Sequence, residues 1–261
     1  MNFLVLPLLF LLATSTATAS RLLPNPINLF GPDSASEGHH VAGSLDCLSW
    51  RLAVEMNNLR NWDTIPEECD VYVGHYMLGH QYPSDCKLVA DIAYDYAKGL
   101  ELTGDGKDAW IFDVDDTCLS NAPYYYVDNT YKAKAYNKTE FVEWELKGEA
   151  PAVPGIVDLY DKLLELGFKI IFITGKSETT LRNITEYNMK NVGFHTWEKL
   201  ILRETSEASL DKVEYKSKKR GEIVADGYRI WGNMGDQWSD LLGDNPGNRT
   251  FKLPMPMFYL K

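Results

Sequence analysis

The sequence predicts an α/β protein built on a parallel sheet, and three observations indicate this fold class. Short apolar runs rich in β-branched and aromatic residues recur after residue 106. Stretches with helical spacing alternate with these runs. The runs are continuous rather than alternating with polar residues, which is typical of strands covered on both faces. We therefore expect a Rossmann-like parallel sheet with helices on both faces.

The expected elements of the core alternate along the chain. The strands are 109–112, 169–173, 199–202 and 229–234, and the helices between them are 154–166, 177–190 and 215–225. Each helix ends just before a glycine, at Gly167, Gly193 or Gly227, and glycine is the residue that most often follows a helix. These elements place the Rossmann-like core in residues 106–261.

Two further helices are expected before the first strand, in a helical extension over residues 44–105. The first, 44–61, begins at a Ser44 cap and has one apolar side, formed by Leu48, Leu52, Met56 and Leu59. The second, 85–100, has at helical spacing Leu88, Val89, Ile92, Ala93, Tyr96 and Ala97. The segment 119–151 fits neither pattern, and we expect it to form a small insertion over the active site.

The amino terminus reads as a targeting segment. Residues 3–13 are an apolar run that is too short to span a bilayer, and small residues suited to cleavage follow up to Ala19. We predict a signal peptide over 1–19, a flexible leader over 20–43 and a folded domain over 44–261. The protein would enter the secretory pathway and become extracellular or vacuolar. Glycosylation is expected at one or more of three sequons, at Asn137, Asn183 and Asn248.

Four cysteines allow three complete disulfide connectivities in an oxidising compartment. Cys118 follows the acidic loop in a position expected to be buried, so it is read as a free thiol. Cys47 and Cys69 are the favoured pair, because they close a modest loop within the helical extension. Cys86 then has no evident partner.

Charge limits the partners of this chain. The formal net charge is −11, which argues against a nucleic-acid surface, since phosphate backbones require basic patches. No later segment is long and apolar enough to cross a membrane. A small phosphorylated substrate would need local positive charge, from specific lysines or from a bound cation. Nothing in the sequence decides between a monomer and a homodimer.

Residues suited to phosphate chemistry follow the expected strands in succession. Asp-x-Asp alone more often marks only a strand end, but here the pattern continues. The set comprises Asp113 and Asp115 after the first strand, Thr174, Gly175 and Lys176 after the second, Lys216 on the basic helix, and Asp236 and Asp240 after the fourth. Because the carboxyl ends of parallel strands share one edge, these residues are expected to meet in one crevice.

The residue types in this cluster indicate phosphoryl transfer. Several carboxylates without a nearby His or Cys suit Mg²⁺, and the start of the helix after Gly175 offers N–H groups to an anion. Asp113 would attack phosphorus, while Asp115 would give a proton to the leaving oxygen and later take one from water. Lys216 would offset charge on the phosphoryl group.

These motifs resemble those of the haloacid dehalogenase superfamily of phosphatases. The chain is most similar to the plant class B acid phosphatases and the related vegetative storage proteins. The likeness runs from about residue 44 to the end and is carried, beside the strand-end motifs, by residues 47–55, 148–152, 195–202, 235–243 and 251–254.

The resemblance implies a haloacid dehalogenase-like fold and Mg²⁺-dependent hydrolysis of phosphate monoesters at acid pH. It implies these roles: Asp113 as nucleophile and metal ligand, Asp115 as acid/base, Thr174 and Lys216 as catalytic and phosphate-binding residues, Gly175 and Lys176 as part of the substrate site, Asp236 as metal ligand and Asp240 in support. With Asp115 and Asp240 included, the predicted metal set is Asp113, Asp115, Asp236 and Asp240. The family pattern also pairs Cys47 with Cys69.

The chain departs from the family pattern at a few positions. Asp116 stands where Glu is usual, and we expect this to change loop packing rather than chemistry. Lys176 stands where Arg is typical, which replaces a two-pronged phosphate contact by a point charge. Cys86 and Cys118 also stand where other residues are expected.

Two functions follow from these observations. The first is a secreted Mg²⁺-dependent acid phosphatase that works through an aspartyl-phosphate intermediate. The alternative is a vegetative storage glycoprotein with weak or no catalytic activity. Some storage proteins of the group lack the nucleophilic aspartate, and its presence here as Asp113 favours the enzyme.

Overall fold

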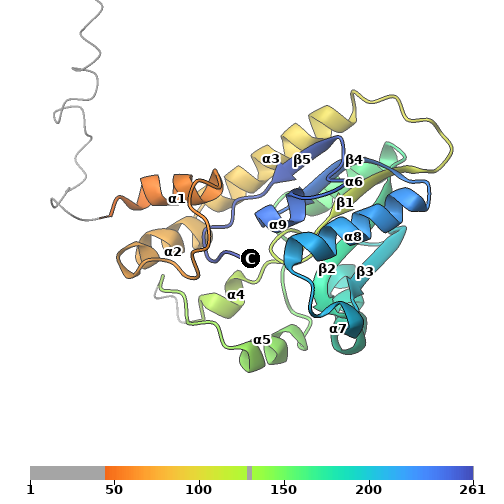
Figure 1. Ribbon diagram of the computed structural model, residues 1–261. Helices are drawn as coiled ribbons and strands as arrows, with labels where there is room; N and C mark the ends of the chain where they lie inside the picture. Colours follow the sequence, from red (N-terminus) through yellow and green to blue (C-terminus); the bar gives the residue numbers. More distant parts are fainter. Residues whose placement is uncertain (1–44, 128–130, 261) are drawn as a thin grey trace, which may run out of the picture. The chain divides into compact units, whose positions relative to one another are not determined.

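A computed structural model describes residues 45–127 and 131–260 (Figure 1). The predicted signal peptide and leader lie outside the described residues. The helical extension comprises α1 (Cys47–Glu55), η3 (Glu67–Cys69), α2 (Asp70–Leu78) and α3 (Gln81–Ala97). The sheet and its helices follow, with α4 (Ala122–Tyr125) and α5 (Lys138–Glu145) inserted after the first strand.

The core is a five-stranded sheet with the order β3-β2-β1-β4-β5. All neighbouring pairs are parallel. The strands are β1 (Asp108–Phe112), β2 (Lys169–Ser177), β3 (Lys199–Arg203), β4 (Arg229–Gly235) and β5 (Arg249–Lys252). The four predicted strands are therefore confirmed. The strand β5 was not predicted, because it is short and half of its residues are exposed, so it lacks an apolar run.

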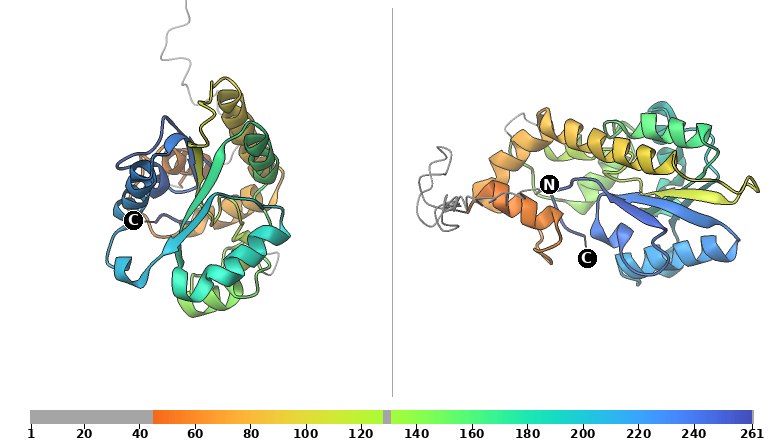
Figure 2. Two further views of the ribbon diagram at one scale, coloured as in Figure 1. Left: turned by 90° about the vertical axis from the view of Figure 1, so that its right-hand side faces the viewer. Right: turned by 90° about the horizontal axis from the view of Figure 1, so that it is seen from above.

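Helices cover both faces of the sheet, as predicted (Figure 2). The remaining elements are α6 (Ile156–Glu165), α7 (Glu178–Asn191), η4 (Thr205–Glu207), α8 (Lys212–Ala225) and α9 (Trp238–Leu241). Trp110 and Phe112 of β1 belong to the larger apolar core, together with residues of α3 and α6. Ile111 faces the other way, into a smaller core beneath α8 that includes Tyr215 and Ile223. This alternation is the two-residue period of a strand.

The three core helices lie where the sequence predicts them. Gly167, Gly193 and Gly227 follow them with φ values of 98°, 114° and 87°, a conformation that costs glycine little. α8 starts at Lys212, three residues before the predicted start, because Asp211 and Glu214 form a reciprocal capping box there.

The apolar side predicted for the first helix is wrong. Leu48, Leu52 and Met56 are 57–58% exposed, whereas Trp50 and Val54 are the buried residues of α1. Two stripes share the helical spacing in this segment, and the stripe with Trp50 and Val54 is the one that packs into the larger core. The predicted Ser44 cap is also wrong, since the helix begins at Cys47 with the Asp46 side chain as cap.

The second predicted helix starts earlier than expected, and the part of it that was predicted buries small residues. α3 buries Tyr82 and Cys86 in its first half and Ala90, Ala93 and Ala97 beyond them, while Leu88 and Ile92 are 59% and 40% exposed. A Cβ at Gly155, just before α6, would lie 3.8 Å from the Ala90 Cβ. Such close approach of α6 favours alanine over leucine at the contact.

The disulfide between Cys47 and Cys69 is present, with Cα atoms 5.3 Å apart. It joins the start of α1 to the start of α2. Cys86 and Cys118 are free and buried, as the sequence analysis expected for Cys118.

Candidate active site

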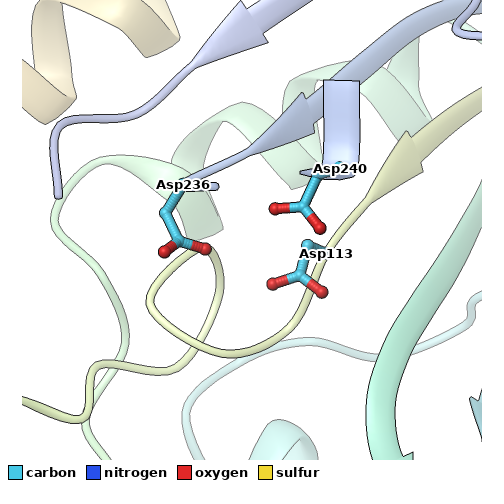
Figure 3. Close-up of side chains that lie close together, drawn as sticks. All are labelled: Asp113, Asp236 and Asp240. Atoms are coloured by element: carbon cyan, nitrogen blue, oxygen red, sulfur yellow. The ribbon is translucent and has the colours of Figure 1, made fainter. Parts of the chain in front are cut away.

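The carboxyl ends of β1 and β4 bring three aspartates together (Figure 3). Oxygen atoms of Asp113, Asp236 and Asp240 lie within 4.8 Å of one another, and all three residues are buried. β1 and β4 are paired, and the Asp113 N–H extends this pairing by donating to the Met234 carbonyl at 3.0 Å. The parallel sheet thus joins residues that are more than 120 positions apart.

Local contacts fix the two aspartates that follow β4. The Thr117 hydroxyl lies 3.1 Å from Asp236 Oδ1 and accepts the Asp236 N–H at 3.0 Å. The Gln237 side chain donates to Asp236 Oδ2 at 2.8 Å, and its N–H donates to Asp240 Oδ2 at 3.0 Å. A Cβ on Gly235 would lie 2.4 Å from the Asp240 Cβ. Only glycine therefore allows Asp240 to fold back beside β4.

Lys216 places a positive charge against this cluster from α8. Its ammonium group is paired with Asp113, lies 3.0 Å from Asp240 Oδ1 and donates to the Ile173 carbonyl at 2.6 Å. Burial alone would lower the pKa of Lys216, but the carboxylates of Asp113 and Asp240 raise it above its ordinary value. The two carboxylates thus favour the charged form of Lys216.

Negative charge exceeds positive charge in this cluster. Burial, followed by the charge of Asp240, raises the pKa of Asp113 from 3.8 to about 7. Burial together with Asp240 and Asp113 also raises the pKa of Asp236 well above its ordinary value. Three buried carboxylates share a single lysine, so negative charge is left over, and their hard oxygen atoms suit a divalent cation such as Mg²⁺. The donor set fits a metal site.

Asp115 occupies a different part of the crevice. Its carboxylate lies 3.4 Å from the Thr174 hydroxyl and 2.8 Å from the Lys176 ammonium group. The acidic group within the described residues that would hold a metal contains Asp113, Asp236 and Asp240 but not Asp115. The predicted residues therefore divide into a carboxylate group with Lys216 and a second group around Asp115.

The strand β2 runs further than predicted. It continues past Thr174 to Ser177, and α7 starts at Glu178. The Thr174 hydroxyl accepts the Lys176 N–H at 3.1 Å, so Gly175 and Lys176 extend along the site instead of opening a helix directly. α7 nevertheless starts only one residue after the predicted position, so the strand takes up the residues where a turn was expected.

Three residues of the site escaped the sequence analysis. Asn121 donates to both Asp116 oxygens, at 2.7 Å and 3.0 Å, and lies 3.3 Å from Asp115 Oδ1. Glu145 pairs with Lys176 from α5. Lys212 lies against Gly175, since a Cβ there would be 3.2 Å from its ammonium nitrogen. None belongs to a strand-end motif, so no local pattern marks them.

Asp116 has the left-handed backbone conformation, with φ 54°. Asp and Asn tolerate this conformation better than most residues. Its carboxylate is buried and is held by Asn121. Burial is the main cause that raises the pKa of Asp116 to about 7. These contacts tie the loop after β1 to the start of α4.

The fold and this carboxylate cluster define a phosphatase of the haloacid dehalogenase type. The sequence model of the HAD superfamily, subfamily IIIB (acid phosphatase), matches residues 33–261. The chain belongs to this family and is a phosphoric monoester hydrolase by class.

Plant proteins of two kinds are similar to this chain. Acid phosphatase 1 of Solanum lycopersicum is 45% identical over 241 residues, which is 92% of each chain. The stem 28 kDa glycoprotein of Glycine max is 47% identical and covers 82% of this chain and 84% of its own. Vegetative storage protein 1 of Arabidopsis thaliana is 41% identical over 100% of this chain and 99% of its own. Both phosphatase and storage names thus occur among these relatives.

A solved structure shares the fold. The class C acid phosphatase of Bacillus anthracis matches with a TM-score of 0.55 and 24% identity over 66% of this chain and 71% of its own. Within the described residues, no helix has the length and apolar character needed to cross a membrane.

Proposed function

We propose that this protein is a secreted Mg²⁺-dependent acid phosphatase that forms an aspartyl-phosphate on Asp113. One observation carries the proposal. The Asp113 carboxylate lies beside two further buried carboxylates and is paired with the buried Lys216. A carboxylate in this setting is oriented for attack, and a fixed ammonium group beside it stabilises negative charge that develops on the phosphoryl oxygens.

Asp113 and Asp115 divide the covalent chemistry between them. Asp113 attacks phosphorus, and the bond from phosphorus to the ester oxygen breaks. Asp115 donates a proton to that oxygen and then takes one from the water that hydrolyses the aspartyl-phosphate. The position of the Asp115 carboxylate, outside the group of Asp113, Asp236 and Asp240 and beside the Thr174 hydroxyl, supports this separate role. Thr174, Gly175 and Lys176 would bind the phosphate group.

The carboxylates of Asp113, Asp236 and Asp240 would hold the Mg²⁺ ion, and Asp115 was predicted as a further ligand. When bound, the ion supplies positive charge that offsets the phosphoryl oxygens. Lys216 holds Asp113 and Asp240 in place through its ion pairs with both.

Secretion and glycosylation are parts of the same proposal. The side chains of Asn137 and Asn248 lie on exposed residues outside helix interiors. The Asn137 Oδ1 caps α5 by accepting the Thr139 N–H at 3.0 Å, which leaves the amide nitrogen for a glycan. Asn183 lies within α7, and its sequon residue Thr185 is buried. We therefore favour Asn137 and Asn248 over Asn183 as glycan sites.

Hydrolysis of a chromogenic phosphate monoester by the purified mature protein tests the proposal. The assay runs from pH 4 to pH 8 with Mg²⁺ and with chelator, on the wild type, Asp113→Asn and Asp244→Asn. Asp244 is an exposed carboxylate of the same charge, outside the cluster. We expect the chelator to abolish turnover, and Asp113→Asn to lose at least about a thousandfold, as is typical when a nucleophile is removed. Full activity of Asp113→Asn would refute the mechanism.

A storage role is the second candidate, favoured by the 41% identity to vegetative storage protein 1 over the whole of this chain. It predicts a folded protein with little or no turnover at any pH, accumulating in vegetative tissue. The two roles differ in the same assay, because only the enzyme depends on Asp113. Presence of Asp113 in this chain favours the phosphatase.

A further inference from the structure

Glu145 is a carboxylate of the site that no part of the proposed reaction uses. It lies at the end of α5 and forms an ion pair with Lys176. The side chains of Lys176 and Glu145 are 8% and 7% exposed. The same ammonium group lies 2.8 Å from Asp115. A buried cation at the predicted phosphate site is thus already occupied by an acidic side chain from the insertion.

The helix that carries Glu145, α5, is attached through partly buried residues. No residue of α5 is buried as a whole, although the Glu145 side chain is, and Phe141 and Trp144 pack against the larger core. The contacts of α5 include aromatic packing, such as Tyr124 against Phe141 with ring centroids 4.9 Å apart. Elements with few buried contacts open at low free energy. The ion pair between Glu145 and Lys176 links the end of α5 to β2. Because α5 contains no residue that is buried as a whole, this ion pair can break without unfolding the core.

Little space remains beside this ion pair. A cavity of about 10 Å³ lies among Asp115, Trp144, Glu145, Lys176 and neighbouring residues of α7. This is room for about one water molecule. A phosphate group that is to contact Lys176 from this side must take the place of the Glu145 carboxylate.

We propose that Glu145 is a latch that sets the affinity of the site for phosphate: its carboxylate holds Lys176 in the free enzyme and leaves when a phosphate group binds there. This inference rests on the proposed function, which makes Lys176 a phosphate-binding residue. A phosphate monoester carries more charge than a carboxylate and has three strong acceptor oxygens, so it displaces Glu145 at the same cation. Repulsion between the two anions then favours release of α5.

The latch should weaken the measured affinity for phosphate. When only a fraction of the enzyme has Lys176 free, the apparent dissociation constant rises by the inverse of that fraction. Removing the charge of Glu145 should therefore tighten phosphate binding. If about one molecule in ten is unlatched, the expected gain is about tenfold.

Calorimetric binding of inorganic phosphate in the presence of Mg²⁺ tests the latch on the wild type, Glu145→Gln and Glu143→Gln. Glu143 is the matched control, since it is an exposed glutamate on the same helix. We expect Glu145→Gln to bind phosphate about tenfold more tightly and to have a lower KM, and Glu143→Gln to match the wild type. A merely structural role of Glu145 predicts the opposite, because a loosened site would bind phosphate more weakly.

Hydrogen exchange of residues 138–147 is the second measurement. Phosphate should speed exchange in the wild type, whereas Glu145→Gln should exchange fast without phosphate. Equal or weaker phosphate binding by folded Glu145→Gln, or slower exchange of α5 on phosphate binding, would overturn the latch. Binding is measured directly, so an inactive wild type would contradict the proposed phosphatase while the comparison of variants still decides on the latch. Glu145→Ala repeats the test if Glu145→Gln fails to fold.

Discussion

Lys216 on α8 donates a hydrogen bond to the carboxylate of Asp113 at the end of β1, although 103 residues separate them in the sequence. The same ammonium group lies 3.0 Å from Asp240. One buried lysine therefore connects the proposed nucleophile with the loop after β4. This contact ties the stability of the fold to the chemistry of the site.

Replacement of Lys216 should lower both the unfolding free energy and kcat. Lys216→Met leaves buried carboxylates without their partner, which typically costs about 3–5 kcal/mol of unfolding free energy. It also removes a fixed charge at the transition state, which we expect to reduce kcat by about 100- to 1,000-fold. Urea unfolding without metal and steady-state kinetics measure the two effects.

The control for this prediction is Lys218→Met on the same helix. The Lys218 side chain is 49% exposed, and its partner Glu207 keeps an ion pair with Lys219 at 2.8 Å when Lys218 is replaced. We therefore expect Lys218→Met to cost at most about 1 kcal/mol. Equal losses in the two variants would show that Lys216 has no special place in the site.

Metal binding should stabilise the fold through Asp236. A ligand present at 100 times its dissociation constant adds about 2.7 kcal/mol of unfolding free energy. We expect Mg²⁺ to raise the Tm of the wild type and of Asp244→Asn, but not that of Asp236→Asn, because Asp236 is one of the three clustered carboxylates. Thermal unfolding with Mg²⁺ and with chelator measures this. An equal shift in Asp236→Asn would place the ion elsewhere.

Low pH should reduce the unfolding free energy by protonating Asp108, at the start of β1. Burial opposes ionisation there, but hydrogen bonds from Arg229 and Trp231 lower the pKa of Asp108 to about 2 from 3.8. A lowered pKa contributes stability that is complete above 3.8 and is lost as the pH falls toward 2. Asp108→Asn should cost about 1–3 kcal/mol at pH 7, the usual value of hydrogen bonds to a charged group.

Urea unfolding between pH 7 and pH 2 measures the difference in unfolding free energy between the wild type and Asp108→Asn. The gap between the wild type and Asp108→Asn should close as the pH approaches 2. Asp91→Asn is the control, since Asp91 forms an exposed pair with Lys87. A gap that stays constant with pH would mean that the charge of Asp108 is not responsible.

The disulfide should stabilise the helical extension. It joins Cys47 and Cys69 across a sequence separation of 22, for which the chain-entropy relation gives about 3 kcal/mol. Serine at both positions should lower the unfolding free energy by this amount. A thiol reagent should find no reactive cysteine in the native wild type and two after unfolding, because Cys86 and Cys118 are buried. Unchanged stability of the double variant would contradict the prediction.

The core of this protein follows from local signals in the sequence. The apolar runs predict four of the five strands, and a glycine after each core helix marks its end. The strand-end residues Asp113, Thr174 and Asp236 could be found because topology alone brings the carboxyl ends of parallel strands to one edge. The disulfide was also predicted, and it joins two helices close in the chain.

Tertiary structure alone decided which side of an ambiguous helix is buried. Leu48 and Leu52 have the same spacing as Trp50 and Val54, so periodicity could not choose between them. The choice depends on what α1 meets, including Trp62, whose ring centroid is 5.2 Å from that of Trp50. The edge strand β5 was missed for a related reason, since pairing with β4 rather than an apolar run makes it a strand.

The residues of the site also fall into those that the sequence predicts and those that only packing places there. Residue type and order predicted the members that follow strands, because their positions depend on the sheet. Glu145 and Lys212 lie at the site because α5 and α8 pack there, and no spacing within the sequence encodes such a contact. The sequence by itself determined the sheet and the chemistry at its edge, whereas packing between distant elements decided which further charges face that chemistry.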